Sequence, residues 1–339
     1  MRDSQKYPQS KAKRRKNETL PRAGDSPKEE ALDQVSQSVD FTKTEGGSFH
    51  AAVDLFRRSK RIVIVTGKQA MPVRCFRLTI RLGAGISTNA GIPDFRSENG
   101  IYSRLDEFKL DTPEDIFHID FFKCNPQPFY TFSKNLISDT SWKPTLCHEF
   151  VKLLEAKKKL LRNYTQNIDG LEKRAGVTRV LQVHGSFSTA RCTACKYKAT
   201  FEVIKPFLET GKVMYCPKCF ERKEGIVKPD IVFFGEKYPP TYDKLIAKDK
   251  AQADLIVVMG SSLKIFPIAG ILDQMSEVPA ILINKETLDA KLKFDHVMKG
   301  DSDAIVSEIC RRLGWDLISP LLMPAIINER DGGLVEFVV

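Results

Sequence analysis

Four of the eight cysteines stand in two close pairs. Cys192 and Cys195 are separated by two residues, as are Cys216 and Cys219, and residues 196–215 lie between the pairs. Two such pairs, each supplying two thiolates, have the spacing of a tetrahedral structural zinc site. A redox role is the alternative, but neither pair opens a helix within a thioredoxin-like unit. Because all four ligands are sulfur, we predict one structural zinc ion with no open position for catalysis.

Small and polar residues follow each of six apolar runs that have the composition of buried parallel strands. The runs are Ile62–Val65, Leu160–Tyr164, Val180–Val183, Leu255–Met259, Ala280–Ile283 and Phe294–Met298. The segments that follow them are, in order, Thr66-Gly67, Thr165–Asp169, His184-Gly185, Gly260–Leu263, Asn284–Glu286 and Gly300–Asp303. Open α/β sheets bind ligands at the carboxyl ends of their strands. The sequence therefore predicts a ligand site built from these strand ends.

Amphipathic helices lie between several of the predicted strands. Pro144–Lys159 and Ser302–Leu313 carry apolar residues at helical spacing. We predict Ser302 as the N-cap of the second helix and Gly314 as its C-terminal stop. Alternating strands and helices predict an α/β fold, a doubly wound parallel (Rossmann-like) sheet. The cysteine pairs add a smaller zinc-binding module and a helical insertion to this sheet.

The composition changes twice along the chain. Residues 1–47 are rich in polar residues and have almost no apolar periodicity, so we predict a disordered tail. We expect the main domain over residues 48–316, with the zinc module inserted at about 186–225. Residues 317–339 form a C-terminal tail. Within it, Leu334–Val339 could add a strand to a sheet edge or remain unstructured.

The net charge of the 339-residue chain is +10. Lys68, Arg74, Arg77 and Arg81 supply part of it from one unusual segment, so we expect no sequence-specific binding of nucleic acid. No apolar run is long enough to cross a bilayer and no secretory signal is present, so we expect an intracellular protein without a membrane span. Lys11–Lys16 is a compact basic cluster that predicts nuclear import; a charged tail without a receptor is the alternative.

The sequence resembles the sirtuins at Gly83–Ser87 and again at Gly91–Ser97. Further matching motifs follow in the family's order at Thr165–Asp169, His184-Gly185, the two cysteine pairs, Lys228–Glu236, Gly260–Leu263 and Asn284–Glu286. The resemblance covers about residues 48–316. It is closest to the nuclear, class I branch at Leu161–Tyr164, Cys195–Lys198 and Ser262–Lys264.

The resemblance implies that the chain deacetylates lysine in proteins with NAD as its co-substrate. NAD is cleaved at the nicotinamide–ribose bond, the acetyl oxygen captures the ribose, and free lysine leaves with O-acetyl-ADP-ribose. His184 is the implied general base toward a ribose hydroxyl, because imidazole titrates near neutrality. Asn167 and Asp169 are implied to hold the nicotinamide ribose and the carboxamide, although a turn after a strand favours the same residue types.

The resemblance also implies which residues bind the two substrates. The implied NAD contacts are Gly83, Ala84, Gly85, Asp94, Phe95, Arg96, Tyr102, Gln166, Asn167, Ile168, Asp169, Gly260, Ser261, Ser262, Asn284, Lys285, Glu286 and Ser302. Val232–Glu236 resembles a substrate strand that pairs with an extended peptide by β-augmentation. Its implied contacts are Val232, Phe234, Gly235 and Glu236; a buried core strand is the other interpretation, and both can hold.

One segment departs from the family. In sirtuins the first strand runs directly into the glycine turn, but here residues 68–83 separate Thr66-Gly67 from the rest of that turn. Removing them restores the pattern without a gap, so our hypothesis is an unspliced in-frame intron or an error in the gene model. The alternative is a real loop that regulates or abolishes NAD binding. Ile62–Val65 and Leu78–Leu82 compete for the sheet centre, and we predict the first because the second contains Arg81.

Two other functions stay open at this point. Mono-ADP-ribosyl transfer could follow the same NAD cleavage with another nucleophile, and an inactive zinc-containing interaction module would result if residues 68–83 block NAD binding. For the deacetylase, the expected partners are acetylated proteins, with histones and transcription factors as candidates. We expect it in the nucleus, where it would act in chromatin silencing, with the cytoplasm as a second location.

Overall fold

The structure is a computed structural model that describes most of the chain. The described residues are 48–67, 86–90, 113–137, 142–219, 225–263, 267–286, 288, 291–317, 326–330 and 334–338. All of them belong to the unit Glu45–Val339. The predictions for residues 1–47 and 68–83 therefore lie outside the described residues.

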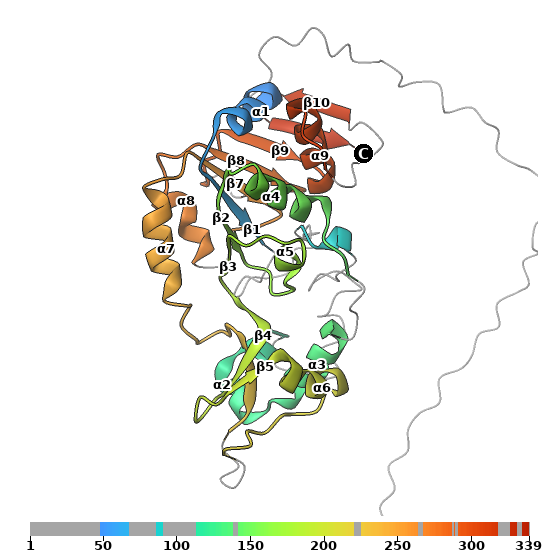
Figure 1. The fold of residues 1–339 in the computed structure, drawn as a ribbon, viewed down its shortest axis with the longest axis vertical. Helices are drawn as coiled ribbons and strands as arrows, with labels where there is room; N and C mark the ends of the chain where they lie inside the picture. The colour runs from blue at the N-terminus through green and yellow to red at the C-terminus, as the bar shows by residue number, and fades with distance from the viewer. Residues whose placement is uncertain are drawn as a thin grey trace, which may run out of the picture. The chain divides into compact units, whose positions relative to one another are not determined.

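A large, mostly parallel sheet organises this unit (Figure 1). Its strands are β1 Ile62–Thr66, β2 Leu160–Thr165, β3 Val180–Gln182, β7 Leu255–Met259, β8 Ala280–Asn284, β9 His296–Lys299, β10 Ile326–Arg330 and β11 Leu334–Val338. They lie in the order β10-β11-β9-β8-β7-β1-β2-β3, and only the β10–β11 pair is antiparallel. The predicted parallel sheet and its six strands are confirmed, with shifts of one or two residues at their ends.

β1 is an interior strand of the sheet, third from the β3 edge, and pairs with β2 on one side and β7 on the other. Ile62 and Ile64 pack on one face of the sheet, whereas Val63 and Val65 pack on the other. A strand covered on both faces must be apolar at every position. The prediction that Ile62–Val65 takes this place is confirmed.

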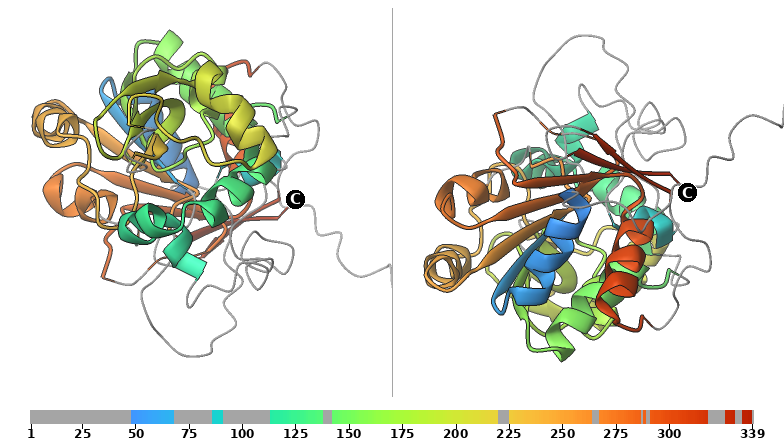
Figure 2. Two further views of the ribbon diagram at one scale, coloured as in Figure 1. Left: turned by 90° about the horizontal axis from the view of Figure 1, so that it is seen from below. Right: turned by 90° about the horizontal axis from the view of Figure 1, so that it is seen from above.

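Helices cover both faces of the sheet (Figure 2). One face packs against α1 Ser48–Arg58, α4 Leu146–Ala156 and α9 Ser302–Leu313. The other face packs against α7 Thr241–Lys250 and α8 Ile271–Gln274. The short elements α5 Leu171–Arg174, η1 Thr88–Ala90 and η5 Ile268–Gly270 stand near strand ends.

The start of α9 differs from the prediction by one residue. Asp301, not Ser302, is the N-cap, because its carboxylate accepts hydrogen bonds from the backbone N–H groups of Asp303 and Ala304. An aspartate in this place also interacts favourably with the positive end of the helix dipole. Gly314 ends the helix at φ 64°, as predicted.

A second, smaller group of elements contains the cysteine pairs and lies at the bottom of Figure 1. Its antiparallel sheet has the order β5-β4-β6, formed by β4 Gly185–Cys192, β5 Lys198–Thr200 and β6 Val227–Ile231. Packed with it are η3 Pro113–Phe117, α2 Ile119–Cys124, α3 Gln127–Ile137 and α6 Phe201–Thr210. Phe122, Phe129 and Phe233 meet edge to face in its core. This core is separate from the two cores of the large sheet.

The C-terminal residues complete the large sheet. β11 pairs in parallel with β9, and β10 folds back beside β11. Val335 and Phe337 are buried, and the Phe337 ring meets Phe49 of α1 edge to face with their centroids 5.3 Å apart. Of the two expectations for the C-terminal tail, the added strand is therefore the correct one for Leu334–Val338.

Val335→Ala should destabilise the whole domain, because this side chain of β11 is fully buried. We expect a loss of about 2 kcal/mol in the free energy of unfolding, measured by urea denaturation. The matched control is Val203→Ala, since Val203 is 43% exposed on α6 and should cost less than about 0.5 kcal/mol. Equal losses would show that the C-terminal hairpin is not part of the folded core.

Candidate functional site

The carboxyl ends of β1, β2 and β7 meet at one point. The backbone N–H of Gln166 donates to the carbonyl of Thr66 at 2.9 Å, and the Ser261 hydroxyl donates to Oε1 of Gln166 at 2.8 Å. Gly67 lies between them, where an added Cβ would stand 2.3 Å from that Oε1. A larger residue at this position would displace the hydrogen-bonded side chains of Gln166 and Ser261. Gly67 therefore allows the ends of the three strands to pack closely.

Asn167 and Asp169, both predicted to bind the cofactor, converge on a third residue. The Ser87 hydroxyl donates to Oδ2 of Asp169 at 2.8 Å and accepts from Nδ2 of Asn167 at 3.0 Å. Asn167 is 2% exposed, and its Oδ1 has no hydrogen-bond partner among the described residues. A buried acceptor without a donor is costly, so this atom is suited to receive a ligand hydroxyl.

Both flanks of residues 68–83 are fixed in this site. On one side, the Thr66 hydroxyl accepts from Nδ2 of Asn163 at 3.1 Å. On the other, the Ile86 carbonyl accepts from the Thr145 hydroxyl at 3.0 Å, and Ser87 makes the contacts just described. The segment itself lies outside the described residues, but the groups that precede and follow it are in place.

His184 lies between β3 and β4, where the chain passes from the large sheet to the small one. Its Nδ1 is 3.2 Å from the carbonyl oxygen of Gln166, and its own carbonyl accepts from Val232 N–H at 2.8 Å. A proton on Nδ1 would be donated to Gln166, which leaves Nε2 as the basic nitrogen. Gly185 follows at φ 73°, where a Cβ would stand 1.9 Å from the Asp230 carbonyl. The sharp turn there needs glycine and sets the position of the histidine.

A buried cluster of three titratable side chains lies beneath Asp169. One donor atom each of His148, Asp169 and Glu172 lies within 4.8 Å of the others. Nδ1 of His148 accepts from the backbone N–H of Thr145 at 3.1 Å, so the imidazole proton is on Nε2. Nε2 of His148 and Oε2 of Glu172 have no hydrogen-bond partner among the described residues.

Burial sets the charges in this cluster. It lowers the pKa of His148 to about 4 and raises the pKa of Glu172 to about 8, the second with help from the negative charge of Asp169. At neutral pH the histidine is uncharged and Glu172 carries a proton. Asp169, the third member of the cluster, accepts hydrogen bonds from the Ser87 hydroxyl and the Leu171 N–H.

Neither His148 nor Glu172 was predicted as part of the site. The sequence carried a weak signal for His148 alone, a polar residue at a core-facing position of the predicted amphipathic helix Pro144–Lys159. Glu172 lies in the four-residue helix α5, which is too short to show an apolar period. His148 is fully buried, yet one of its ring nitrogens has no partner among the described residues.

The strand ends of β7 and β8 and the start of α9 form the other half of the predicted NAD site. Gly260 has φ 60°, and its N–H donates to the Ile283 carbonyl at 3.0 Å. Nδ2 of Asn284 donates to the Glu286 carbonyl at 2.8 Å. Lys285 pairs with Asp301 at 3.4 Å.

The remaining predicted NAD contacts differ in burial. Ser261 after β7 and Ser302 at the start of α9 are buried, whereas Ser262 after β7 and Ile168 after β2 are half-buried. Predictions for seven residues lie outside the described part of the chain: Gly83, Ala84, Gly85, Asp94, Phe95, Arg96 and Tyr102.

The predicted substrate strand Val232–Glu236 is wrong in its secondary structure. β6 ends at Ile231, and the N–H of Glu236 donates to the Phe233 carbonyl, which closes a turn. The N–H of Phe234 donates to the Phe117 carbonyl. Gly235 takes φ 85° in this turn, and the Glu236 carboxylate accepts from the Phe233 N–H at 2.9 Å. The almost fully buried Nζ of Lys228 lies 2.9 Å from the same carboxylate. The segment is therefore a turn closed by local hydrogen bonds and not a straight strand.

Part of this segment nevertheless lines a groove. Val232, Gly235 and Glu236 border a hollow of about 960 Å³ together with Gly185 and Tyr238. The Phe234 ring is 42% exposed, which is unusual for a residue of this size.

The four predicted zinc ligands form one cluster. The Sγ atoms of Cys192 and Cys219 are 3.9 Å apart, and those of Cys195 and Cys216 are 3.6 Å apart. Four sulfurs at Zn–S bonds of about 2.3 Å stand roughly 3.8 Å from one another in a tetrahedron. A Cβ on Gly225 would lie 2.6 Å from Sγ of Cys192, so the backbone closes tightly over the cage. The residues fit a structural zinc ion.

The sequence matches the Sir2 family over residues 83–267. This range covers more than half of the chain and contains both cysteine pairs and the ends of β2, β3 and β7. The chain belongs to the Sir2 family. The matched range starts at Gly83, the last residue of the segment that departs from the sirtuin pattern.

Curated Sir2-family relatives have similar names. The Drosophila melanogaster "NAD-dependent histone deacetylase sirtuin-1" is 43% identical over 78% of this chain and 33% of its own length. The Homo sapiens "NAD-dependent protein deacetylase sirtuin-1" is 43% identical over 80% of this chain and 37% of its own length. The Caenorhabditis elegans "NAD-dependent protein deacetylase sir-2.1" is 40% identical over 85% of this chain and 44% of its own length. The chain therefore spans less than half the length of these three relatives.

A solved structure supports the same relationship. It is described as "Structural Basis for the Mechanism and Regulation of Sir2 Enzymes" and is 29% identical to this chain, with a TM-score of 0.66. The match covers 79% of this chain and 98% of the other. Among the described residues, no helix is both long and apolar enough to cross a membrane.

Gly225→Ala should weaken zinc binding by this Sir2-family chain, because the new methyl group would push Cys192 out of the cage. We expect one zinc ion per wild-type chain and loss of zinc from the variant at about tenfold less chelator, measured by elemental analysis after dialysis. Gly176→Ala is the control, since its Cβ would meet nothing closer than 3.6 Å. Equal zinc retention in both variants would contradict the assigned cage.

Glu172→Gln should change how stability depends on pH. The folded-state pKa of Glu172 is raised from 4.5 to about 8. Its stabilising contribution is therefore complete below pH 4.5 and is lost as the pH rises through 8. Glutamine does not titrate, so the variant should gain roughly 4 kcal/mol relative to wild type between pH 5 and pH 9, measured by urea unfolding. Glu209→Gln, at a half-exposed position, should show no such gain; a parallel response would refute the buried proton.

Proposed function

We propose that this chain is an NAD-dependent protein lysine deacetylase. The observation that carries the proposal is the junction of Ser87, Asn167, Asp169 and His184 at one edge of the sheet. The three predicted catalytic residues come from the ends of β2 and β3, which are neighbours in the sheet. The names of the curated relatives, all NAD-dependent deacetylases, support the same chemistry.

The residues of the site fit NAD. When bound, NAD supplies an activated nicotinamide–ribose bond that the acetyl oxygen of the substrate can attack. The unpaired Oδ1 of Asn167 is suited to accept a hydrogen bond from a ribose hydroxyl. The Asp169 carboxylate, which already accepts from the Ser87 hydroxyl and the Leu171 N–H, is suited to accept from the carboxamide N–H as well. His184 Nε2 would take the proton of a ribose hydroxyl, a role worth about 10²–10⁴-fold in rate.

The substrate peptide would lie along the turn that follows β6. The N–H of Val232, a residue that lines the groove, donates to the His184 carbonyl. This hydrogen bond places the groove beside the proposed catalytic base. The exposed Phe234 ring offers an apolar wall for the methylene chain of acetyl-lysine. Because Phe234 already uses its N–H with Phe117, pairing with a peptide would use other backbone groups of this segment.

The assembled site favours catalysis over an inactive module. Thr66 and Ser87, on either side of residues 68–83, both reach the residues that follow or belong to β2. No observation favours mono-ADP-ribosyl transfer. The proposed substrates are acetylated proteins; histones are candidates, since the fly relative is named a histone deacetylase. The cluster Lys11–Lys16 supports a nuclear location for this activity, with a role in chromatin silencing.

The decisive assay is NAD-dependent release of nicotinamide from an acetyl-lysine peptide. His184→Ala should lower kcat/KM by at least about a hundredfold, because the base is lost. His50→Ala is the matched control, since His50 is an exposed residue of α1, and it should leave the rate unchanged. Peptide deacetylation that survives His184→Ala would overturn the assigned base.

Deleting residues 68–83 tests the departure from the family. The deletion joins Thr66-Gly67 directly to Ala84, and a misplacement of about 1 Å can cost on the order of a hundredfold in rate. We therefore expect the shortened chain to be about a hundredfold more active than the full chain in the same assay. Equal rates would make the segment a tolerated loop, and no activity in either form would overturn the deacetylase.

A further inference from the structure

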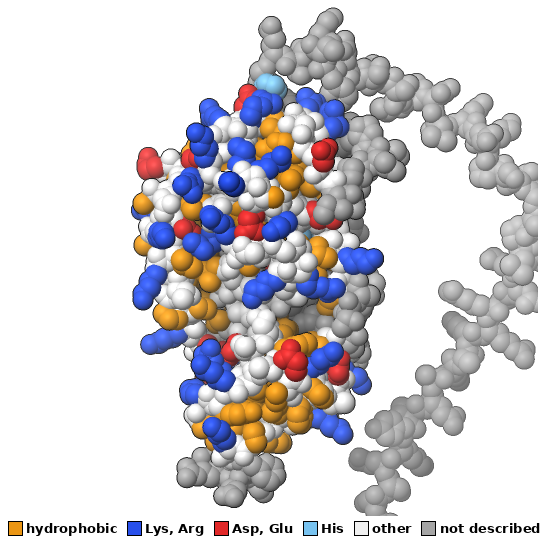
Figure 3. Space-filling view, viewed as in Figure 1, with side chains coloured by type: hydrophobic (Ala, Val, Ile, Leu, Met, Phe, Trp, Pro, Cys, Tyr) orange, Lys and Arg blue, Asp and Glu red, His pale blue; other side chains and the backbone are white. Residues whose placement is uncertain are grey.

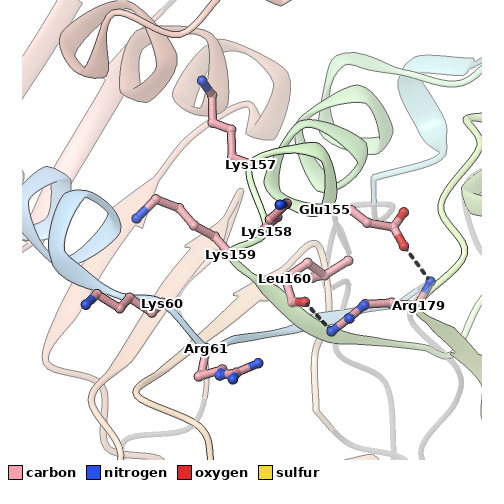
Figure 4. Close-up of a pocket in the computed structure, with 8 residues that line it drawn as sticks. All are labelled: Lys60, Arg61, Glu155, Lys157, Lys158, Lys159, Leu160 and Arg179. Carbon is pink, nitrogen blue, oxygen red and sulfur yellow. Dashed lines mark hydrogen bonds between the residues drawn. The ribbon is translucent and has the colours of Figure 1, made fainter.

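A hollow of about 630 Å³ lies where β1 and β2 begin, at the sheet edge opposite the cofactor site. Six cations line it: Lys60, Arg61, Lys157, Lys158, Lys159 and Arg179. Figure 4 shows that they come from the turn between α1 and β1, the turn between α4 and β2, and the segment before β3. Three separate parts of the chain thus bring the same charge to one place.

Glu155 is the one carboxylate among the residues that line the hollow, and both it and the nearby Asp254 are already engaged by backbone N–H groups. Glu155 accepts hydrogen bonds from the backbone N–H groups of Thr178 at 2.9 Å and Arg179 at 3.0 Å. Asp254 accepts from the backbone N–H groups of Lys60 and Arg61. No ion pair among the described residues joins any of the six cations to a carboxylate. In Figure 3, Lys and Arg side chains gather over the upper part of the molecule, where α1 and α4 lie.

A purely structural role explains some of these cations. Nζ of Lys159 donates to the carbonyls of Arg57 at 2.9 Å and Ser59 at 2.7 Å, at the C-terminal end of α1. Lys157 stands 5.0 Å over the Trp315 ring. A cation at a helix C-terminus also offsets the negative end of the helix dipole.

The structural role leaves Lys60, Arg61 and Lys158 unexplained. Lys158 holds φ 59°, a left-handed conformation that favours glycine and costs a lysine about 1 kcal/mol. The turn that ends α4 accounts for this angle, because the N–H groups of Lys158 and Lys159 donate to the carbonyls of Glu155 and Leu154. That turn uses the Lys158 backbone and not its ammonium group. Arg179 donates to the Leu160 carbonyl at 3.3 Å, which holds its guanidinium at the wall of the hollow.

The lining defines the chemistry of the ligand. Leu160 is the only apolar residue among those that line the hollow. None of the lining residues is aromatic, so none could stack on a base. The volume falls in the range of about 300–1,000 Å³ that is usual for small-molecule sites. Lysines and arginine forks at this density match phosphate groups, each of which carries more charge than a carboxylate.

We propose that this hollow binds a compact anion that carries several phosphate groups. The ligand would be a polyphosphorylated small molecule or the end of an inorganic polyphosphate chain. The concave shape favours such a ligand over a DNA duplex, whose rod would meet only the outermost side chains. Because the hollow lies at the amino ends of the strands, binding does not compete with NAD and is independent of the proposed deacetylation.

The test uses the full chain and isothermal titration calorimetry at physiological ionic strength. Inositol hexakisphosphate and a short inorganic polyphosphate are the two probes. The double variant Lys60→Ala with Lys158→Gly removes two charges and relieves the strained φ angle, so it should fold. We expect it to weaken binding of at least one probe by about tenfold. Saturating NAD should leave binding of that probe by the wild-type chain unchanged.

The matched control is Lys212→Ala with Lys244→Ala, which removes the same charge from exposed positions outside the hollow. It should bind the probe as the wild type does. Equal loss in both double variants, or no loss in the first, would place the binding elsewhere and overturn the proposal. Tighter binding of a duplex DNA or of a phosphate-free acidic peptide, with the same sensitivity to Lys60 and Lys158, would overturn it in favour of that partner class.

Discussion

The junction of β1 with β2 and β7 is the constraint on which the site depends. Parallel strands bring their carboxyl ends to one edge only if their registers are fixed. Here the N–H of Gln166 continues the β1–β2 ladder beyond its last residue, and its side chain ties in Ser261 after β7. Gly67 lets these groups approach within hydrogen-bonding distance because it has no side chain. Apolar burial on both faces of β1 holds this junction in place.

Much of this arrangement follows from the sequence because it depends on local patterns. Continuous apolar runs indicate strands buried on two faces, and Gly314 ends a helix by backbone geometry alone. The misses have two physical origins. His148 and Glu172 become a cluster only when α4 and α5 pack together, which no local pattern shows. The cap of α9 is a local choice between Asp301 and Ser302, and both residue types suit that position.

The buried cluster shows how a protein can hold two neighbouring acidic side chains. Two carboxylates that are both ionised at this distance would repel each other. Burial and the negative charge of Asp169 raise the pKa of Glu172 to about 8, and burial lowers the pKa of His148 to about 4, so both side chains are neutral at pH 7. Asp169 is also the member of the cluster that Ser87 contacts from beyond residues 68–83. One hydrogen bond therefore joins the buried cluster to the far flank of the atypical segment.

The two edges of the parallel sheet differ in chemistry for a geometric reason. At the carboxyl edge the strand ends expose small polar residues and backbone amides, which suit a dinucleotide. At the amino edge helices α1 and α4 end, and their C-terminal carbonyls attract cations. Lys159 uses that attraction and closes the turn between α4 and β2. Once one lysine is fixed in this way, each further cation beside it is repelled, so Lys60, Arg61 and Lys158 together raise the energy of the free protein. An anion that relieves this repulsion binds with a free-energy gain that needs no rearrangement of the fold.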